Sequence, residues 1–266
     1  MMKVSVITVC YNAEEDIEKT LLSVIKQSYK DFEYIVVDGK SKDRTMEIVN
    51  RYSKRITRMA SELDTGIYNA MNKGVRMATG DYCIFMNAGD TFAGAEVLKQ
   101  VVPFLTGEFD VIVGREISIE RGKIVNYNVP PTMITSLYLY QSSLCHQASF
   151  IKREVLAQYP YDENLRMVSD WKFWIETLLI HKLSYRSVDI NICCFNHEGI
   201  TYTQTDIGKK ERKRILTEYM PLQMLKTCQK ETEHFSVKWL LFRIGRKIER
   251  IINLKRLKDY NIEWYL

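Results

Sequence analysis

Three residues near the start of the chain have side chains suited to holding a nucleoside. Thr8 and Tyr11 fall at the end of the apolar run in residues 4–12, and Asp38 closes a second apolar run in residues 34–38. A carboxylate can accept hydrogen bonds from a ribose hydroxyl or a base N–H, and an aromatic ring such as that of Tyr11 can stack on a base. These residue types and their places in the chain therefore predict a nucleotide site.

The elements that must position these residues are two strands with a helix between them. Each apolar run ends in small polar residues, and a helix-length stretch separates the two runs, which is typical of a parallel βαβ unit. Ligands of such sheets bind beyond the carboxyl ends of the strands, where we expect Thr8, Tyr11 and Asp38 to project. Strands and helices continue to alternate through residues 1–106, which predicts a mostly parallel sheet flanked by helices.

The composition is that of an ordinary globular protein, with 46% apolar and 27% charged residues among 266. This length suits one large domain with an appendage. Residues 205–266 hold 15 basic and 8 acidic residues, whereas the remainder holds 23 and 25. A basic excess confined to one part of the chain argues against a nucleic-acid-binding catalytic domain. The six cysteines include no CxxC pair, which predicts reduced core thiols rather than a metal site or disulfides.

The first two predicted strands, with the polar residues that end them, resemble the start of family 2 glycosyltransferases of the GT-A fold. In that family these strands hold the nucleotide of a sugar donor. The resemblance covers about residues 3–204 and implies an α/β protein with a single Rossmann-like sheet. We expect residues 1–204 to form the glycosyltransferase domain, and residues 205–266 to form a basic amphipathic helical tail. Within the domain, we expect a nucleotide-binding half in residues 1–106 and an acceptor half in residues 107–204.

The segment after the fourth predicted strand resembles the family's DxD motif, whose carboxylate oxygens hold a divalent cation beside the donor diphosphate. Here it reads Asn87-Ala88-Gly89-Asp90, similar to an NxGD form found in a bacterial subset of the family. The resemblance implies that Asp90 binds Mg2+ or Mn2+, that His197 is a second metal ligand, and that Asn87 lies beside the donor. The alternatives are a plain turn at the strand end and a hydrogen-bonded surface histidine.

The stretch from Glu62 to Gly74 resembles the family's diphosphate-facing segment, in which a glycine precedes a helix that ends in Asn-x-Gly. A helix N-terminus offers free N–H groups to a phosphate. Many relatives carry an arginine where Met71 stands, so we expect Lys73 or the metal to neutralise the diphosphate. Asp64 is expected to contact the base, the ribose or the donor sugar, or alternatively to cap the helix.

The segment Ser169-Asp170-Trp171-Lys172-Phe173-Trp174 resembles the family's Glu-Asp-x-x-x-Trp segment, with Ser169 in place of the glutamate. In inverting members this aspartate is the base that takes the proton of the acceptor hydroxyl as that hydroxyl attacks the anomeric carbon. The resemblance therefore implies that Asp170 is the catalytic base, with a helix cap as the alternative. His146 and Gln147 precede a predicted strand, and we expect them to contact the acceptor or to make a strand-entry hydrogen bond.

Residues 237–252 alternate apolar and basic side chains at helical spacing. This pattern is typical of a helix on an anionic membrane surface, and the alternative is a helix packed on the enzyme or on a second subunit, so a homodimer stays open. The apolar runs are shorter than a membrane span and residues 1–3 enter a strand directly. We therefore expect a cytoplasmic protein bound peripherally to the inner face of the plasma membrane.

We expect an inverting glycosyltransferase that moves a hexose or an N-acetylhexosamine from a nucleotide sugar to an acceptor hydroxyl. UDP is the default nucleotide, and the acceptor is a lipid-linked oligosaccharide or polysaccharide. The alternative is a non-catalytic nucleotide-sugar-binding scaffold at the membrane, which the replacements at Met71, Asn87, Gly89 and Ser169 support. A nucleotidyltransferase is set aside because residues 10–15 lack a glycine-rich basic loop.

Overall fold

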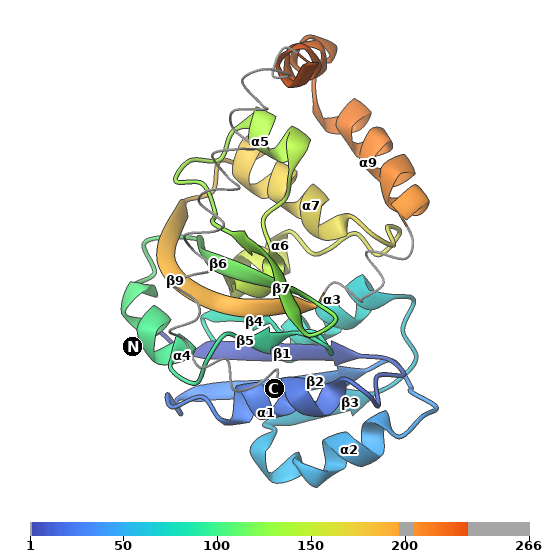
Figure 1. Ribbon diagram of the computed structural model, residues 1–266, viewed down its shortest axis with the longest axis vertical. Helices are drawn as coiled ribbons and strands as arrows, with labels where there is room; N and C mark the ends of the chain where they lie inside the picture. Colours follow the sequence, from blue (N-terminus) through green and yellow to red (C-terminus); the bar gives the residue numbers. More distant parts are fainter. Residues whose placement is uncertain (1, 197–204, 234–266) are drawn as a thin grey trace.

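A nine-stranded mixed sheet lies at the centre of the computed structural model, which describes residues 2–196 and 205–233 (Figure 1). Its strand order is β3-β2-β1-β4-β8-β6-β9-β5, and β7 pairs with β6 off this path. The strands are β1 (Val4–Cys10), β2 (Phe32–Asp38), β3 (Arg58–Ser61), β4 (Tyr82–Phe85), β5 (Thr91–Phe92), β6 (Val111–Glu120), β7 (Lys123–Asn128), β8 (Ser149–Lys152) and β9 (Tyr185–Asn196).

Parallel pairing joins β1, β2, β3 and β4, as the sequence predicts, whereas β5 pairs antiparallel with β9. The second half is mixed: β8 runs antiparallel to β4 and to β6, whereas β6 and β9 are parallel. β6 lies inside the sheet, between β8 and β9. The first residues of β6 pair with β8, and its second half pairs with β7. The opposite edge of β6 pairs with β9, so this long strand has three partners.

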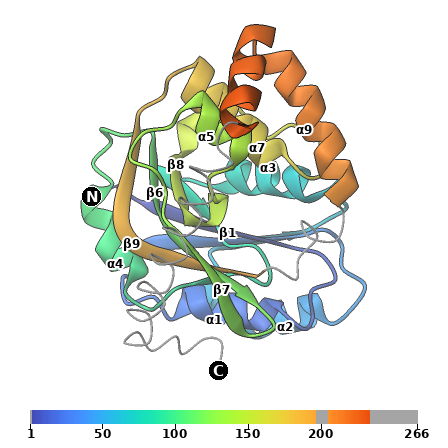
Figure 2. The same cartoon turned by 45° about the horizontal axis from the view of Figure 1, so that its top comes forward.

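Helices cover both faces of the sheet (Figures 1 and 2). The apolar residues of β1 alternate between two core clusters, with Val4 and Val6 facing α1, α2 and α4, and Ile7 and Val9 facing α3, α6 and α7. The helices of the first face are α1 (Ile17–Ile25), α2 (Thr45–Arg51) and α4 (Val97–Val101). Those of the second are α3 (Ile67–Met77), α5 (Ser136–Gln141), α6 (Arg153–Gln158) and α7 (Ser169–Trp174).

Short single turns complete the fold. The 3₁₀ turn η3 (His146–Ala148) leads directly into β8, and the π-helical segment η4 (Ile175–Ile180) extends α7. Two further 3₁₀ turns follow α2 and α4, namely η1 (Ser53–Arg55) and η2 (Val102–Phe104).

Helix α9 (Thr205–Tyr219) packs on the second half of the fold (Figure 2). Ile215 is fully buried in the core cluster that also holds α3 and α7. The Glu211 carboxylate accepts hydrogen bonds from the backbone N–H groups of Arg166 (2.8 Å) and Met167 (2.9 Å), just before α7. The start of the predicted tail is thus built into the core, while residues 237–252, where we predict a surface helix, lie outside the described residues. Within the described part, the helices all lack the combined length and apolar character that crossing a bilayer requires.

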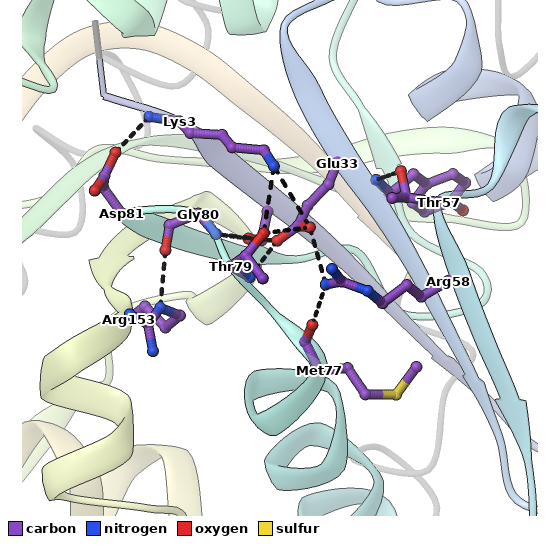
Figure 3. A network of polar contacts seen from close by, with 11 residues as sticks. Lys3, Glu33, Thr57, Arg58, Met77, Thr79, Gly80, Asp81 and Arg153 are labelled. Carbon is purple, nitrogen blue, oxygen red and sulfur yellow. Dashed lines mark hydrogen bonds and ion pairs between the residues drawn. The ribbon is translucent and has the colours of Figure 1, made fainter.

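A polar network closes the amino ends of the strands, away from the strand ends where ligands of such sheets bind (Figure 3). The Glu33 carboxylate is almost fully buried and accepts hydrogen bonds from Ser5 and from the backbone and hydroxyl of Thr79. Arg58 lies 3.2 Å and Lys3 3.7 Å from its Oε2 atom. Burial raises the pKa of Glu33, but these hydrogen bonds outweigh burial and hold the pKa below its ordinary value. The network therefore fixes this end of the sheet with an ionised carboxylate.

Candidate active site

The candidate site lies where β4 and β8 meet. The two strands are antiparallel, with Tyr82 opposite Lys152 and Cys83 opposite Ile151. Continuing this register past the end of β4 brings the turn 87–90 level with η3, which precedes β8. The sheet topology therefore places His146 and Gln147 beside the turn that holds Asn87 and Asp90.

Asp170 lies in the first turn of α7 and faces this region. Its Oδ1 atom accepts a hydrogen bond from the Tyr68 hydroxyl at 3.0 Å, and its Oδ2 atom lies 3.2 Å from Nδ1 of His146. Burial raises the pKa of Asp170, but the hydrogen bonds from His146 and Tyr68 hold the pKa below its ordinary value. The N-cap of α7 is Val168, without a side-chain cap. Asp170 is therefore an ionised carboxylate at neutral pH, and 20% of its side chain is exposed.

Aromatic rings pack around Tyr161, next to the Tyr68 side chain that contacts Asp170. The Tyr161 ring lies 5.6 Å from that of Tyr68, 5.7 Å from that of Phe85 and 5.4 Å from that of Phe173, measured between centroids. Among the described residues, the buried hydroxyls of Tyr161 and Ser169 have no hydrogen-bond partner. Because buried polar groups are normally paired, these two hydroxyls are available to a ligand or to water.

Asp90 is buried on the other side of η3. Its Oδ2 atom accepts a hydrogen bond from the Gln147 amide at 2.8 Å, and its Oδ1 atom accepts one from the Asn196 backbone at 2.9 Å. Burial raises the pKa of Asp90 to about 7. Gln147 is 3% exposed and faces Asp90, so the structure gives it a role inside the protein, and its contact with an acceptor stays a prediction.

The turn 87–90 offers two side-chain oxygen donors that could contact a divalent cation, one on Asn87 and one on Asp90. Asn87 Oδ1 is buried without a partner among the described residues, and Asp90 supplies a carboxylate, so the chemistry suits a hard cation. The described residues nonetheless include no group of three or more His, Cys, Asp or Glu that could hold a metal. His197 lies outside the described residues. A cation at this turn would therefore need further ligands besides Asn87 and Asp90.

Two of the predicted nucleoside contacts lie inside the protein, which corrects our expectation that they project beyond the strands. The Thr8 hydroxyl bonds with the Tyr34 hydroxyl (3.0 Å) and with the Met86 carbonyl (2.8 Å), and Thr8 has no exposed surface. Asp38 is also fully buried and accepts hydrogen bonds from the hydroxyls of Ser41 and Ser61. The reason is that the chain after β2 folds back onto Asp38, so in this structure Asp38 shapes the loop.

Tyr11 and Asp64 both lie beside the Gly39 backbone, with Tyr11 exposed and Asp64 partly buried. Tyr11 is 57% exposed, directly after β1. A Cβ atom on Gly39 would come within 2.4 Å of Asp64 Oδ2 and 3.2 Å of Tyr11 Cδ2. Asp64 also accepts a hydrogen bond from the N–H of Gly66, the N-cap residue of α3. The structure thus brings together an aromatic ring and a carboxylate beside Gly39, which has no side chain to separate them.

Lys73 does not extend freely toward this surface. Its amine donates to the Leu63 carbonyl at 2.7 Å and pairs with Glu62 at 3.0 Å, and 15% of its side chain is exposed. Its role in neutralising a diphosphate stays a prediction, and that role would require the amine to leave these partners.

Tyr68, which touches Asp170, has no role that its sequence pattern indicates. It lies 102 residues from Asp170 in the chain, and nothing in its local pattern distinguishes it from a core residue. The backbone N–H of Asn196, which binds Asp90, carries no residue-specific signal at all. Ser61, at the end of β3, and Ser41, in the loop after β2, hold Asp38, and neither differs in sequence from an ordinary strand-end or loop serine.

The strand order and the solved structures that share it give this chain the GT-A fold. The chain belongs to glycosyl transferase family 2, because the sequence model of that family matches residues 5–158. The family prediction made from the sequence is thereby confirmed.

Curated relatives support the same assignment. The chain is 29% identical over 218 residues to the PGL/p-HBAD biosynthesis glycosyltransferase of Mycobacterium bovis, and the match covers 79% of this chain and 83% of that protein. It is 30% identical over 210 residues to an uncharacterised glycosyltransferase of Mycobacterium tuberculosis, covering 74% of this chain and 76% of that protein.

Solved structures share the fold. S. aureus TarS 1–349 in complex with UDP-GlcNAc matches with a TM-score of 0.65 at 21% identity, covering 89% of this chain and 73% of that one. For the complex of TarS 1–349 with UDP the TM-score is 0.61 at 24% identity over 73% of this chain, which spans 60% of that chain's length. Mannosyltransferase PcManGT from Pyrobaculum calidifontis, in complex with GDP-Man and Mn2+, gives a TM-score of 0.54 at 20% identity, covering 72% of this chain and 56% of that one. At these identities the likeness establishes the fold.

Proposed function

We propose that this protein transfers a sugar from a nucleotide-sugar donor to an acceptor hydroxyl with inversion, using Asp170 as the base. The observation that carries the proposal is the ionised Asp170 carboxylate, held on both oxygens and partly exposed beside the turn 87–90. A base for hydroxyl deprotonation must be charged at the working pH and held in a fixed orientation. Asp170 meets both requirements.

In the proposed reaction the acceptor O–H bond breaks and its proton passes to Asp170. The acceptor oxygen forms a bond to the anomeric carbon while the bond from that carbon to the diphosphate oxygen breaks, and the electron pair leaves with the nucleoside diphosphate. One in-line displacement of this kind inverts the anomeric centre. The negative charge of Asp170 also stabilises the positive charge that develops on the sugar ring.

We assign Tyr11 and Asp64 to the nucleoside and Asn87 to the donor, with UDP as the preferred nucleotide. UDP is supported by the structural neighbour that binds UDP and UDP-GlcNAc. Mg2+ or Mn2+ bound at Asp90, with His197 as a further ligand, would stabilise the charge on the departing diphosphate. A neighbour's complex with GDP-Man and Mn2+ supports GDP as the alternative nucleotide and a metal-dependent reaction.

We further propose that the chain acts on a lipid-linked saccharide at an anionic membrane surface. Exposed basic residues on the described part of the tail support this proposal, because they form one face of α9, where Lys210, Lys213 and Arg214 line a surface hollow. Sedimentation with vesicles containing phosphatidylglycerol should bring the protein down, and phosphatidylcholine vesicles should not. Equal sedimentation with both would contradict membrane attraction by charge.

Titration calorimetry with UDP and then GDP, each with and without Mn2+, tests the donor assignment. Metal-dependent binding of one nucleotide would support a donor site that includes Asp90. Binding that does not depend on metal would support the proposed transferase and contradict a metal-dependent donor site. Folded protein that binds neither nucleotide would contradict the proposal and favour a scaffold that does not use nucleotide sugars.

A further inference from the structure

His146 connects the turn that ends β4 with the helix that carries Asp170. Its Nδ1 atom is 3.2 Å from Asp170 Oδ2, and its Nε2 atom is 3.1 Å from Asn87 Nδ2. Only 12% of its side chain is exposed. One side chain on η3 thus touches two parts of the proposed active site, one on the donor side and one at the base.

The two contacts determine which nitrogen of the neutral His146 ring carries the proton. An ionised carboxylate can only accept hydrogen bonds, so the Nδ1 atom that faces Asp170 must be the donor. The Nε2 atom is then an acceptor, and it receives an N–H of the Asn87 amide. The hydrogen bonds therefore all run in one direction, from Asn87 through His146 to Asp170, an arrangement in which each bond strengthens the next.

The surroundings hold the His146 ring in place. The Phe85 ring lies 6.2 Å from it in an edge-on arrangement at 80°. On the backbone of η3, the Ala148 N–H and the Ser149 hydroxyl both donate to the Cys145 carbonyl. The next side chain, Gln147, is fixed by its hydrogen bond to Asp90. The fixed His146 ring can therefore hold the Asp170 carboxylate in one orientation.

We propose that His146 is a positioning residue, which orients the Asp170 carboxylate and ties it to the donor-side turn through Asn87. With Tyr68 on the other oxygen, the two donors prevent rotation of the carboxylate about its bond to Cβ. A base displaced by about 1 Å can lose roughly a hundredfold in rate, so this restraint is worth a large factor in turnover. The inference rests on the proposed function and replaces the expectation that His146 contacts the acceptor.

The tautomer of His146 can be measured without any substrate. The chain contains four histidines, so long-range 1H–15N correlation spectra of 15N-histidine-labelled protein will be simple, and the signal absent from His146→Asn assigns this residue. We expect the neutral Nδ1–H form. The Nε2–H form would overturn the proposal whether or not the protein proves to be a glycosyltransferase.

Two amide substitutions separate the two contacts in an activity assay. Asparagine can place an N–H near the position of Nδ1 and so keep the bond to Asp170, whereas glutamine reaches only the position of Nε2. We expect His146→Gln to lower kcat about a hundredfold and His146→Asn about tenfold, with an unchanged Kd for UDP in both. Equal kcat values for wild type and His146→Gln, or an effect on the acceptor KM alone, would overturn the positioning role.

The wild type and Asp170→Asn are the reference pair for this assay. If Asp170→Asn loses turnover and His146→Gln keeps it, the inference about His146 fails while the proposed function stands. If the wild type itself turns over no nucleotide sugar, the proposed function fails, and the tautomer measurement still decides the contact between His146 and Asp170.

Discussion

The hydroxyl of Tyr68 donates a hydrogen bond to Oδ1 of Asp170 at 3.0 Å, joining helix α3 to helix α7 across 102 residues of sequence. Tyr68 is 5% exposed, so the bond forms away from solvent. It couples the helix of the predicted diphosphate-facing segment to the predicted base, and it helps to keep that partly buried base ionised.

Tyr68→Phe removes this bond and should raise the pKa of Asp170, because the hydrogen bonds that oppose burial are then reduced. Turnover needs the ionised form, which is lost as the pH falls through the pKa, so the acid limb of the pH–kcat profile should move to higher pH. We expect about a tenfold loss of kcat near the wild-type acid limb and a smaller loss at alkaline pH. Tyr29→Phe is the control, because the Tyr29 hydroxyl has no partner among the described residues and its ring packs against the core cluster on the other face of the sheet. Acid limbs that coincide in wild type and Tyr68→Phe would refute this role.

Gly39→Ala should weaken nucleotide binding without unfolding the protein. The new Cβ would meet Asp64 Oδ2 at 2.4 Å and Tyr11 Cδ2 at 3.2 Å, and both are ends of side chains that can move aside. Displacing these two proposed nucleoside contacts should raise the Kd for UDP about tenfold or more, measured by calorimetry. Gly94→Ala is the matched control, since a Cβ there meets nothing within 4 Å. Equal Kd values for the two variants would remove Tyr11 and Asp64 from the nucleoside site.

Glu33→Gln should destabilise the fold in a pH-dependent way. The folded-state pKa of Glu33 lies below its ordinary value of 4.5, so the stability from the ionised carboxylate is fully present above 4.5. It is lost as the pH falls through the folded-state pKa. At neutral pH the variant should lose about 1–3 kcal/mol of unfolding free energy by urea denaturation, and the difference from wild type should shrink in acid. A difference that does not change with pH would show that the charge of Glu33 is not responsible.

A surface carboxylate provides the comparison for that measurement. Glu47 pairs with Arg51 one helical turn away and is 61% exposed, so Glu47→Gln should change the unfolding free energy by no more than about 0.5 kcal/mol.

Arg212→Gln should loosen α9 from the core. The Arg212 guanidinium lies 4.0 Å from the centre of the Trp171 ring and donates to the carbonyls of Leu139 and Tyr140. Losing these contacts should lower the unfolding free energy by about 1–3 kcal/mol, seen as a lower Tm in calorimetry. Arg214→Gln on the exposed side of the same helix should change Tm little. The same Tm for both variants would mean that α9 adds nothing to the stability of the core.

Much of the fold could be predicted from the sequence because its signals are local. The apolar runs of β1 and β2 and the alternation of strands with helices predict the parallel pairing of β1 to β4. The place of Asp170 at the start of a helix also follows from the local pattern. The family's motifs supply the order in which these pieces occur.

The remaining features depend on contacts between distant parts of the chain. Whether Thr8 faces solvent or Tyr34 depends on which neighbour β1 acquires, and residue type does not reveal that. His146 and Gln147 touch Asn87 and Asp90 because β8 runs antiparallel to β4, a pairing that no local pattern predicts. The burial of Ile215 in the core likewise requires the three-dimensional structure, since a basic helix reads from sequence as a solvated one.

The central claim is that Asp170 is the base, and Asp170→Asn tests it most directly. The amide keeps the size of the side chain and one oxygen acceptor but cannot take a proton from an acceptor hydroxyl. The measurement is UDP release from UDP-sugars with simple glycoside acceptors, beside the Kd for UDP from calorimetry. We predict that turnover falls about a thousandfold or more while the Kd stays within about twofold of wild type. Near-normal turnover in the variant would contradict the assignment.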